Sequence, residues 1–199
     1  NQDEGGTLMQ AFNSMQSELK RYIEELEYET ANRNRLEGEL SAAHQIQMSM
    51  LPGNGSLFDQ QPRFELWAHL IPAKSVGGDL YQFHLQKDNK LILILGDVSD
   101  KGVAAALFMS RSISLFRQQF NHQRNLSEMM FETNNMLVEN NDACMFVTLF
   151  YAELDLLSGQ LDYVSAGHHS PILMRNGAVS ELIQESATAL GLIDDIEYP

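Results

Sequence analysis

The stretch Leu91-Ile92-Leu93-Ile94-Leu95-Gly96-Asp97-Val98-Ser99-Asp100-Lys101-Gly102 decides how this chain is organised. A continuous apolar run closed by Gly-Asp predicts a strand that is buried on both faces. Such a strand delivers the carboxylate of Asp97 to its end. The glycines then allow the backbone to turn tightly into a helix that starts at about Val103.

A second stretch, Val76-Gly77-Gly78-Asp79-Leu80-Tyr81, repeats the arrangement of a carboxylate beside glycine at a strand end. The segments 80–86 and 91–98 are separated by a short polar turn, which predicts an antiparallel hairpin. We therefore expect Asp79 and Asp97 to lie close together in the folded protein.

Two carboxylates beside accessible backbone carbonyls suit a hard cation such as Mg²⁺, Mn²⁺ or Ca²⁺. Two such ions can share a carboxylate and activate water for phosphoryl hydrolysis. The alternative is that both Gly-Asp pairs only form turns. A phosphate-binding loop is disfavoured, because Lys101 precedes Gly102 instead of following it. His168 and His169 are adjacent and point in different directions, so they are poor joint zinc ligands.

The composition limits the function classes that the chain can serve. It has 199 residues, of which 44% are hydrophobic and 20% charged, and its net charge is −14. This charge argues against unaided binding to nucleic acid or to an anionic lipid surface. The single cysteine, Cys144, excludes an internal disulfide, and its apolar surroundings predict a buried structural thiol. Because it begins at Asn1 and stops at Pro199 in mid-pattern, we expect the chain to be an excerpt of a longer protein.

The segment 8–51 shows a heptad pattern of apolar residues with charged residues between them. A lone amphipathic helix packed on the domain is the alternative, but the length and regularity favour a coiled coil that forms a parallel homodimer. Pro52 and Gly53 end this helix, 52–63 reads as a linker, and 64–199 as a folded domain. The apolar stripe consists of Leu8, Phe12, Met15, Leu19, Tyr22, Leu26, Leu36, Leu40 and Ala43.

The remaining pattern predicts an α+β domain, because strands are followed by two helices and then by more strands. Asn176-Gly177 is the strongest hairpin signal, and Asn125 with Glu128 looks like a helix-capping pair. Strands are expected at 64–70, 80–86, 91–98, 143–154, 160–165, 172–175 and 178–182, and helices from 103 to before 121 and from 125 to about 139.

Five blocks resemble, in order, those of bacterial PPM-type serine/threonine phosphatases of the RsbU/SpoIIE family. Together they cover about residues 42–192. They are Ala42 to Pro52, which leads into the domain; Pro72 to Tyr81 and Gly96 to Gly102, which are similar to the two metal motifs; and Phe146 to Phe150 and Ala166 to Pro171.

The resemblance implies a fold of two antiparallel β-sheets packed together and flanked by helices. It also implies Mn²⁺- or Mg²⁺-dependent hydrolysis of phosphoserine or phosphothreonine on a partner protein, with two ions per complete site. Asp97 matches the bridging carboxylate, Asp79 a second metal ligand and the Val98 carbonyl a backbone ligand. Gly78 and Asp100 are candidates for supporting these ligands.

In relatives, the helices after the second metal motif act as a switch that completes the metal site. Here they would be roughly 103–139, with Val103, Leu107 and Met109 as their marker residues. The family continues with a further block that carries another metal-binding Asp, and this chain stops before it. We therefore expect the fragment itself to be weakly active or inactive.

Residues 1–20 resemble the end of a HAMP domain, with Asp3-Glu4-Gly5 followed by Ala11-Phe12-Asn13-Ser14-Met15. The resemblance implies a membrane sensor whose spanning part lies upstream. The chain would then be the cytoplasmic part of an inner-membrane protein.

Three functions remain open from the sequence. The first is a phosphatase acting on a phosphorylated regulatory protein, for which the family suggests a STAS-like antagonist. The second is a catalytically silent module that binds and sequesters such a partner. The third, a structural coiled coil, explains only the N-terminal helix. We expect His168 to be a turn or core histidine and Thr148 to lie on a strand face.

Overall fold

The computed structural model describes residues 2–53, 61–72, 74–120, 125–182 and 187–199. The chain divides into two compact units, Asn1–Ala43 and His44–Pro199. The first unit is a helix, and the second contains the sheet and the hydrophobic core.

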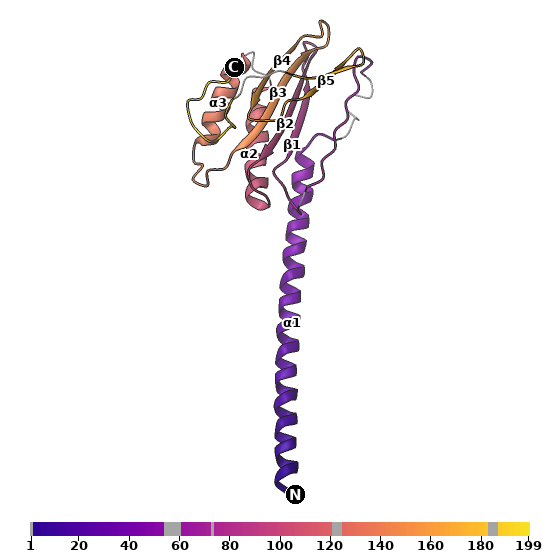
Figure 1. Ribbon diagram of the computed structural model, residues 1–199, viewed down its shortest axis with the longest axis vertical. Coiled ribbons are helices and arrows are strands. Elements are labelled where there is room, and N and C mark those ends of the chain that lie inside the picture. The colour runs from indigo at the N-terminus through magenta and orange to yellow at the C-terminus, as the bar shows by residue number, and fades with distance from the viewer. Residues whose placement is uncertain (1, 54–60, 73, 121–124, 183–186) are drawn as a thin grey trace. The chain divides into compact units, whose positions relative to one another are not determined.

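The first unit is helical throughout its described residues, and the same helix, α1 (Gln2–Met50), continues into the second unit (Figure 1). The apolar stripe is exposed from Leu8 to Leu36, with Leu8 at 74% and Leu19 at 60% of their full accessible area. A stripe of this kind buries its apolar surface only against another chain or domain. No helix among the described residues combines the length and apolarity needed to cross a membrane.

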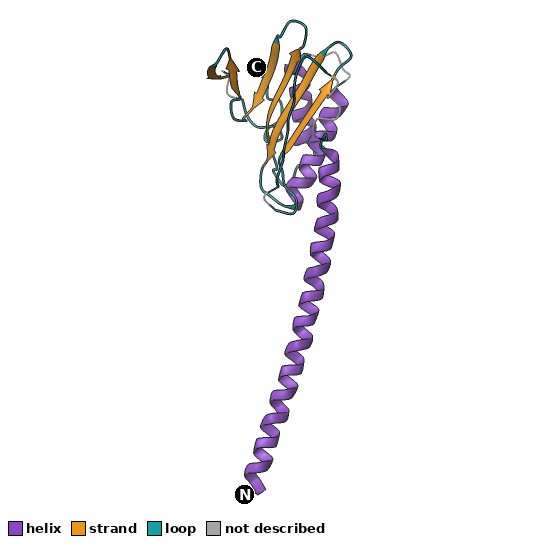
Figure 2. Cartoon of the chain, turned by 90° about the vertical axis from the view of Figure 1, so that its right-hand side faces the viewer, coloured by secondary structure: helices purple, strands orange, loops and turns teal. Residues whose placement is uncertain are grey.

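The second unit is built around a four-stranded antiparallel sheet in the order β1-β2-β3-β4 (Figure 2). A separate antiparallel hairpin follows it, and its turn, Asn176-Gly177, has positive φ at both residues, as a two-residue hairpin turn requires. The strands are β1 (Leu80–Leu85), β2 (Lys90–Val98), β3 (Val147–Asp155), β4 (Leu161–Ala166), β5 (Ile172–Arg175) and β6 (Ala178–Glu181).

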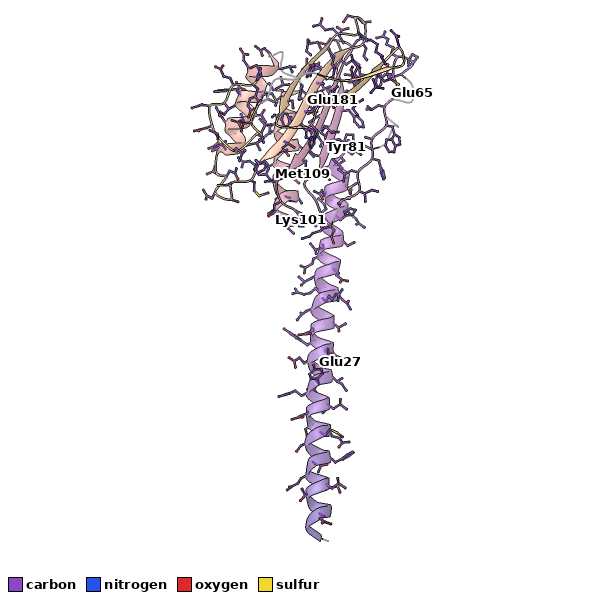
Figure 3. All side chains as sticks on the ribbon, in the orientation of Figure 1. Glu27, Glu65, Tyr81, Lys101, Met109 and Glu181 are labelled. Atoms are coloured by element: carbon purple, nitrogen blue, oxygen red, sulfur yellow. The ribbon has the colours of Figure 1, made fainter. Side chains whose placement is uncertain are left out.

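Two helices, α2 (Val103–Gln119) and α3 (Leu126–Val138), cover one face of the four-stranded sheet (Figures 1 and 2). Ile92 of β2 and Met109 of α2 are fully buried in the core on this side, and Figure 3 labels Met109 on its helix. The Asn125 side chain caps α3 by accepting hydrogen bonds from the backbone N–H groups of Ser127 and Glu128. The predicted α+β class and both helices are confirmed.

Two sequence predictions are wrong in this unit. The segment 64–70 alternates as predicted, with Phe64, Leu66, Ala68 and Leu70 packed on the core, but none of its residues belongs to a strand. Cys144 is exposed. It lies in a turn at positive φ, where its N–H donates to the Asn141 carbonyl, and β3 begins only at Val147.

Gly78 allows the chain entering β1 to approach the end of β2 closely. A Cβ built on Gly78 would lie 2.8 Å from the carbonyl oxygen and 2.9 Å from the Cβ of Val98. Any side chain there would push the two segments apart. On Gly77, by contrast, a Cβ would meet only the Pro72 Cβ at 3.5 Å, which is an ordinary contact.

We predict that Gly78→Ala destabilises the second unit by about 1–3 kcal/mol, the usual cost of overpacking against rigid neighbours. Gly77→Ala is the matched control and should change the free energy of unfolding by much less. Chemical denaturation monitored by circular dichroism measures both values. Equal losses in the free energy of unfolding would contradict the special role of the close contact between Gly78 and Val98.

Candidate metal centre

The two predicted carboxylates lie side by side at one end of the sheet. Leu80 of β1 pairs with Gly96 of β2, so Asp79, one residue earlier, stands opposite Asp97. The pKa of Asp79 is raised, and burial is the largest cause. The nearby charge of Asp97 and a hydrogen bond between the two carboxyl groups raise it further. The charge of His168 opposes this shift. The expected pairing of Asp79 with Asp97 is therefore present in the structure.

The backbone around this pair adds further oxygen atoms. The Val98 carbonyl faces Gly78, and its position is set by the close approach described above. Asp100, at positive φ, accepts a hydrogen bond from the Lys101 N–H at 2.8 Å and is exposed. Whether Asp100 supports the metal ligands remains a prediction.

The donor set fits a hard divalent cation. The ligand candidates are carboxylate and carbonyl oxygens, which Mg²⁺ and Mn²⁺ prefer. Burial and the nearby charge of Asp97 both raise the pKa of Asp79, and a bound cation would offset both effects. Among the described residues, no group of three or more His, Cys, Asp and Glu side chains gathers closely enough to hold a metal ion.

The structure also brings Thr148 and His168 to this site, where the sequence analysis expected only structural roles. The Thr148 hydroxyl lies 3.0 Å from Nδ1 of His168 and donates to the Asp97 carbonyl at 3.3 Å. The pKa of His168 is lowered, mainly by burial and also by the neighbouring His169. The charge of Asp79 and a hydrogen bond with the Thr148 backbone act in the opposite direction and raise it. A prediction that the 143–154 strand pairs with the 91–98 strand would have placed Thr148 beside Asp97.

The end of α1 that belongs to the second unit contacts the segment that leads into Asp79. The Gln47 side chain donates to the Gly77 carbonyl at 2.6 Å and accepts from the Gly77 N–H at 3.2 Å. Its Nε2 also lies 3.6 Å from the Met109 sulfur. Of the three marker residues of the predicted switch, Met109 is buried, whereas Val103 and Leu107 on the same helix are 53% and 67% exposed.

Comparison with known families agrees with this architecture. The family model described as Stage II sporulation protein E (SpoIIE) matches residues 87–199. The protein IcfG of Synechocystis sp. is 30% identical over 99% of this chain and 34% of its own length. Phosphoserine phosphatase RsbU of Bacillus subtilis is 28% identical over 82% of this chain and 48% of its own length. The chain thus spans about a third to a half of these relatives.

Solved structures show the same fold. The RsbU and RsbW domains of Rv1364c from Mycobacterium tuberculosis match with a TM-score of 0.57 and 25% identity, over 65% of this chain and 36% of that one. The SiaA-PP2C domain of Pseudomonas aeruginosa matches with a TM-score of 0.63 and 22% identity, over 85% of this chain and 67% of that one. With the family model covering more than half of its residues, the chain belongs to the SpoIIE family and has the fold of PPM-type, or PP2C, phosphatase domains.

Proposed function

We propose that this chain carries part of the catalytic site of a metal-dependent protein serine/threonine phosphatase. The observation that carries the proposal is the Asp79–Asp97 pair, held at the ends of paired strands in a member of the SpoIIE family. The relatives RsbU and RsbP are named phosphoserine phosphatases, which supports a phosphorylated side chain as substrate.

Asp97, Asp79 and the Val98 carbonyl would hold Mn²⁺ or Mg²⁺, with two ions in a complete site. When bound, the ions lower the pKa of water and neutralise charge on the phosphoryl oxygens. Asp97 is exposed, so a phosphorylated side chain on the surface of another protein can reach it. The register of β1 and β2 holds the two carboxylates in place before the substrate arrives, which spares the reaction the cost of ordering them.

The proposed substrate is a phosphorylated regulatory protein, and a STAS-like antagonist is the class that the family resemblance implies. The chain's net charge of −14 means that this partner is not recruited through a basic surface. Recognition would instead depend on the phosphoryl group itself and on contacts around the site.

A second candidate is a catalytically silent module that binds and sequesters such a partner. It is favoured by one observation, that the described residues bring only two carboxylates together and no third metal-binding side chain. Catalysis and sequestration differ in whether the phosphoryl group is hydrolysed, so a turnover assay separates them.

We predict that Asp97→Asn lowers kcat/KM toward a phosphoserine peptide by at least about 100-fold, because it removes a negative charge that would hold the cation. The cation would in turn stabilise the negative charge on the phosphoryl oxygens in the transition state. The assay measures phosphate release with Mn²⁺ and with Mg²⁺, in the 199-residue chain and in the full gene product that contains it. EDTA should abolish the activity.

Asp162→Asn is the matched control for this experiment. Asp162 lies on β4 and is exposed, and its side chain accepts a hydrogen bond from the Gln160 amide at 2.9 Å, so activity should be unchanged. Undiminished turnover in Asp97→Asn would contradict the metal mechanism. Absence of turnover in the unaltered full gene product, with partner binding retained, would favour the sequestering module.

We further propose that α1 connects the phosphatase to an upstream membrane sensor and forms a parallel homodimer. The HAMP-like start at 1–20 supports the first statement, and the exposed apolar stripe supports the second. The chain would then act on the cytoplasmic side of the inner membrane. A signal reaching the end of α1 would meet Gln47, whose side chain holds Gly77 two residues before Asp79.

We predict that Leu19→Glu weakens dimerisation at least tenfold (about 1.4 kcal/mol), because it places a charge in the apolar seam. Ser17→Glu adds the same charge on the opposite side of the helix and should leave the dimer intact. Sedimentation velocity over a concentration series measures both dissociation constants. A monomeric unaltered chain at tens of micromolar would contradict the coiled coil.

A further inference from the structure

Thr148 and His168 lie outside the two metal motifs, yet their side chains reach the end of β2 that carries Asp97. Thr148 of β3 pairs directly with Asp97 of β2, so both side chains lie on the same face of the sheet. The Thr148 hydroxyl lies within hydrogen-bond distance of the Asp97 carbonyl oxygen and of Nδ1 of His168, and the charge of His168 lowers the pKa of Asp79. Asp79 stands opposite Asp97, and we call these four residues the ring.

The Thr148 hydroxyl lies between two partners. Its single proton points at the Asp97 carbonyl oxygen, 3.3 Å away, or at Nδ1 of His168, 3.0 Å away, depending on the imidazole tautomer. In either tautomer the hydroxyl is the group that links the end of β2 with the imidazole.

The backbone around His168 is arranged to hold the imidazole in this position. Gly167 lies at positive φ and forms a bridge with Leu149, the residue after Thr148. A Cβ on Gly167 would lie 3.2 Å from the Ala189 backbone nitrogen, so both the conformation and the space require glycine. The Ser165 hydroxyl donates to the His168 carbonyl at 3.2 Å, which anchors the turn independently of the imidazole.

We infer that Thr148 and His168 are positioning residues that hold the Asp79–Asp97 pair in the geometry needed to bind a divalent cation. Among the described residues, His168 does not gather with Asp79 and Asp97 closely enough to form a three-member metal-binding group, so the inference assigns it no ligand role. Their role is to connect the Asp97 backbone on one side with the Asp79 carboxylate on the other. The inference deepens the proposed function and rests on it for the identity of the ion.

The alternative is that His168 only stabilises its own turn. In that case the Ser165 hydrogen bond and the Gly167 bridge would keep the turn folded, and removal of the imidazole would not affect the cation. The two explanations therefore differ in metal affinity measured without substrate, and not only in stability.

We predict that Thr148→Val and His168→Ala each weaken Mn²⁺ binding about 10-fold or more, the usual effect of removing groups that orient metal ligands. Because both act through one ring, the double variant should be little weaker than either single variant. Isothermal titration calorimetry with Mn²⁺ alone, on the full gene product that contains this chain, measures these affinities.

Two matched controls accompany this test. Thr148→Ser keeps the hydroxyl and should bind Mn²⁺ within about 2-fold of the unaltered protein, whereas Val keeps the shape of Thr but loses the hydroxyl. His169→Ala removes the neighbouring imidazole, which is not hydrogen-bonded to Thr148 in the structure, and should also have little effect. Unchanged affinity in both Thr148→Val and His168→Ala would overturn the inference.

A measurement without metal separates this inference from the proposed function. The ring predicts faster hydrogen exchange at the end of β2, around Asp97, in Thr148→Val and His168→Ala but not in Thr148→Ser. Unchanged exchange in both variants would show that no such ring operates. Failure of the unaltered protein to bind Mn²⁺ or Mg²⁺ would instead refute the proposed metal site, whatever the exchange experiment shows.

Discussion

The rest of the site depends on the opposition of Asp79 and Asp97 across the first two strands. The register between Leu80 and Gly96 places one carboxylate against the other, and Gly78 allows this close approach. The raised pKa of Asp79 means that the fold favours its protonated form. This stabilisation is present at low pH and is lost as the pH rises through that raised pKa. A cation bound at the site would instead favour the ionised form of Asp79.

The sequence alone was sufficient for the parts of the site that local pattern determines. A buried apolar run followed by Gly-Asp, repeated upstream in one hairpin, predicted the pairing of Asp79 with Asp97, because the two strands are joined by a short turn. The long helix, the cap at Asn125 and the Asn176 hairpin were predictable for the same reason, since each depends on residues close together in the chain.

The parts that the sequence did not reveal depend on pairing between distant segments. Thr148 reaches the site only because β3 pairs with β2, and His168 only because Gly167 bridges to Leu149. No local pattern around either residue specifies these partners. The wrong prediction of a strand at 64–70 has the same origin, because alternation predicts which side chains face the core but does not by itself place a segment in a sheet. Cys144 was misjudged because a turn precedes β3.

The contact between Gln47 and Gly77 gives the proposed metal centre a physical connection to the end of α1. Two hydrogen bonds fix the backbone of Gly77, and Gly78 and Asp79 follow it directly. The Met50 carbonyl at the end of the same helix accepts hydrogen bonds from Gln82 and Arg117, so this last turn is also tied to β1 and α2. A movement of the helix end that breaks the Gln47 contact would release the segment that carries Asp79. Because such coupling is reciprocal, a cation that fixes Asp79 must favour the same helix position to the same extent in free energy.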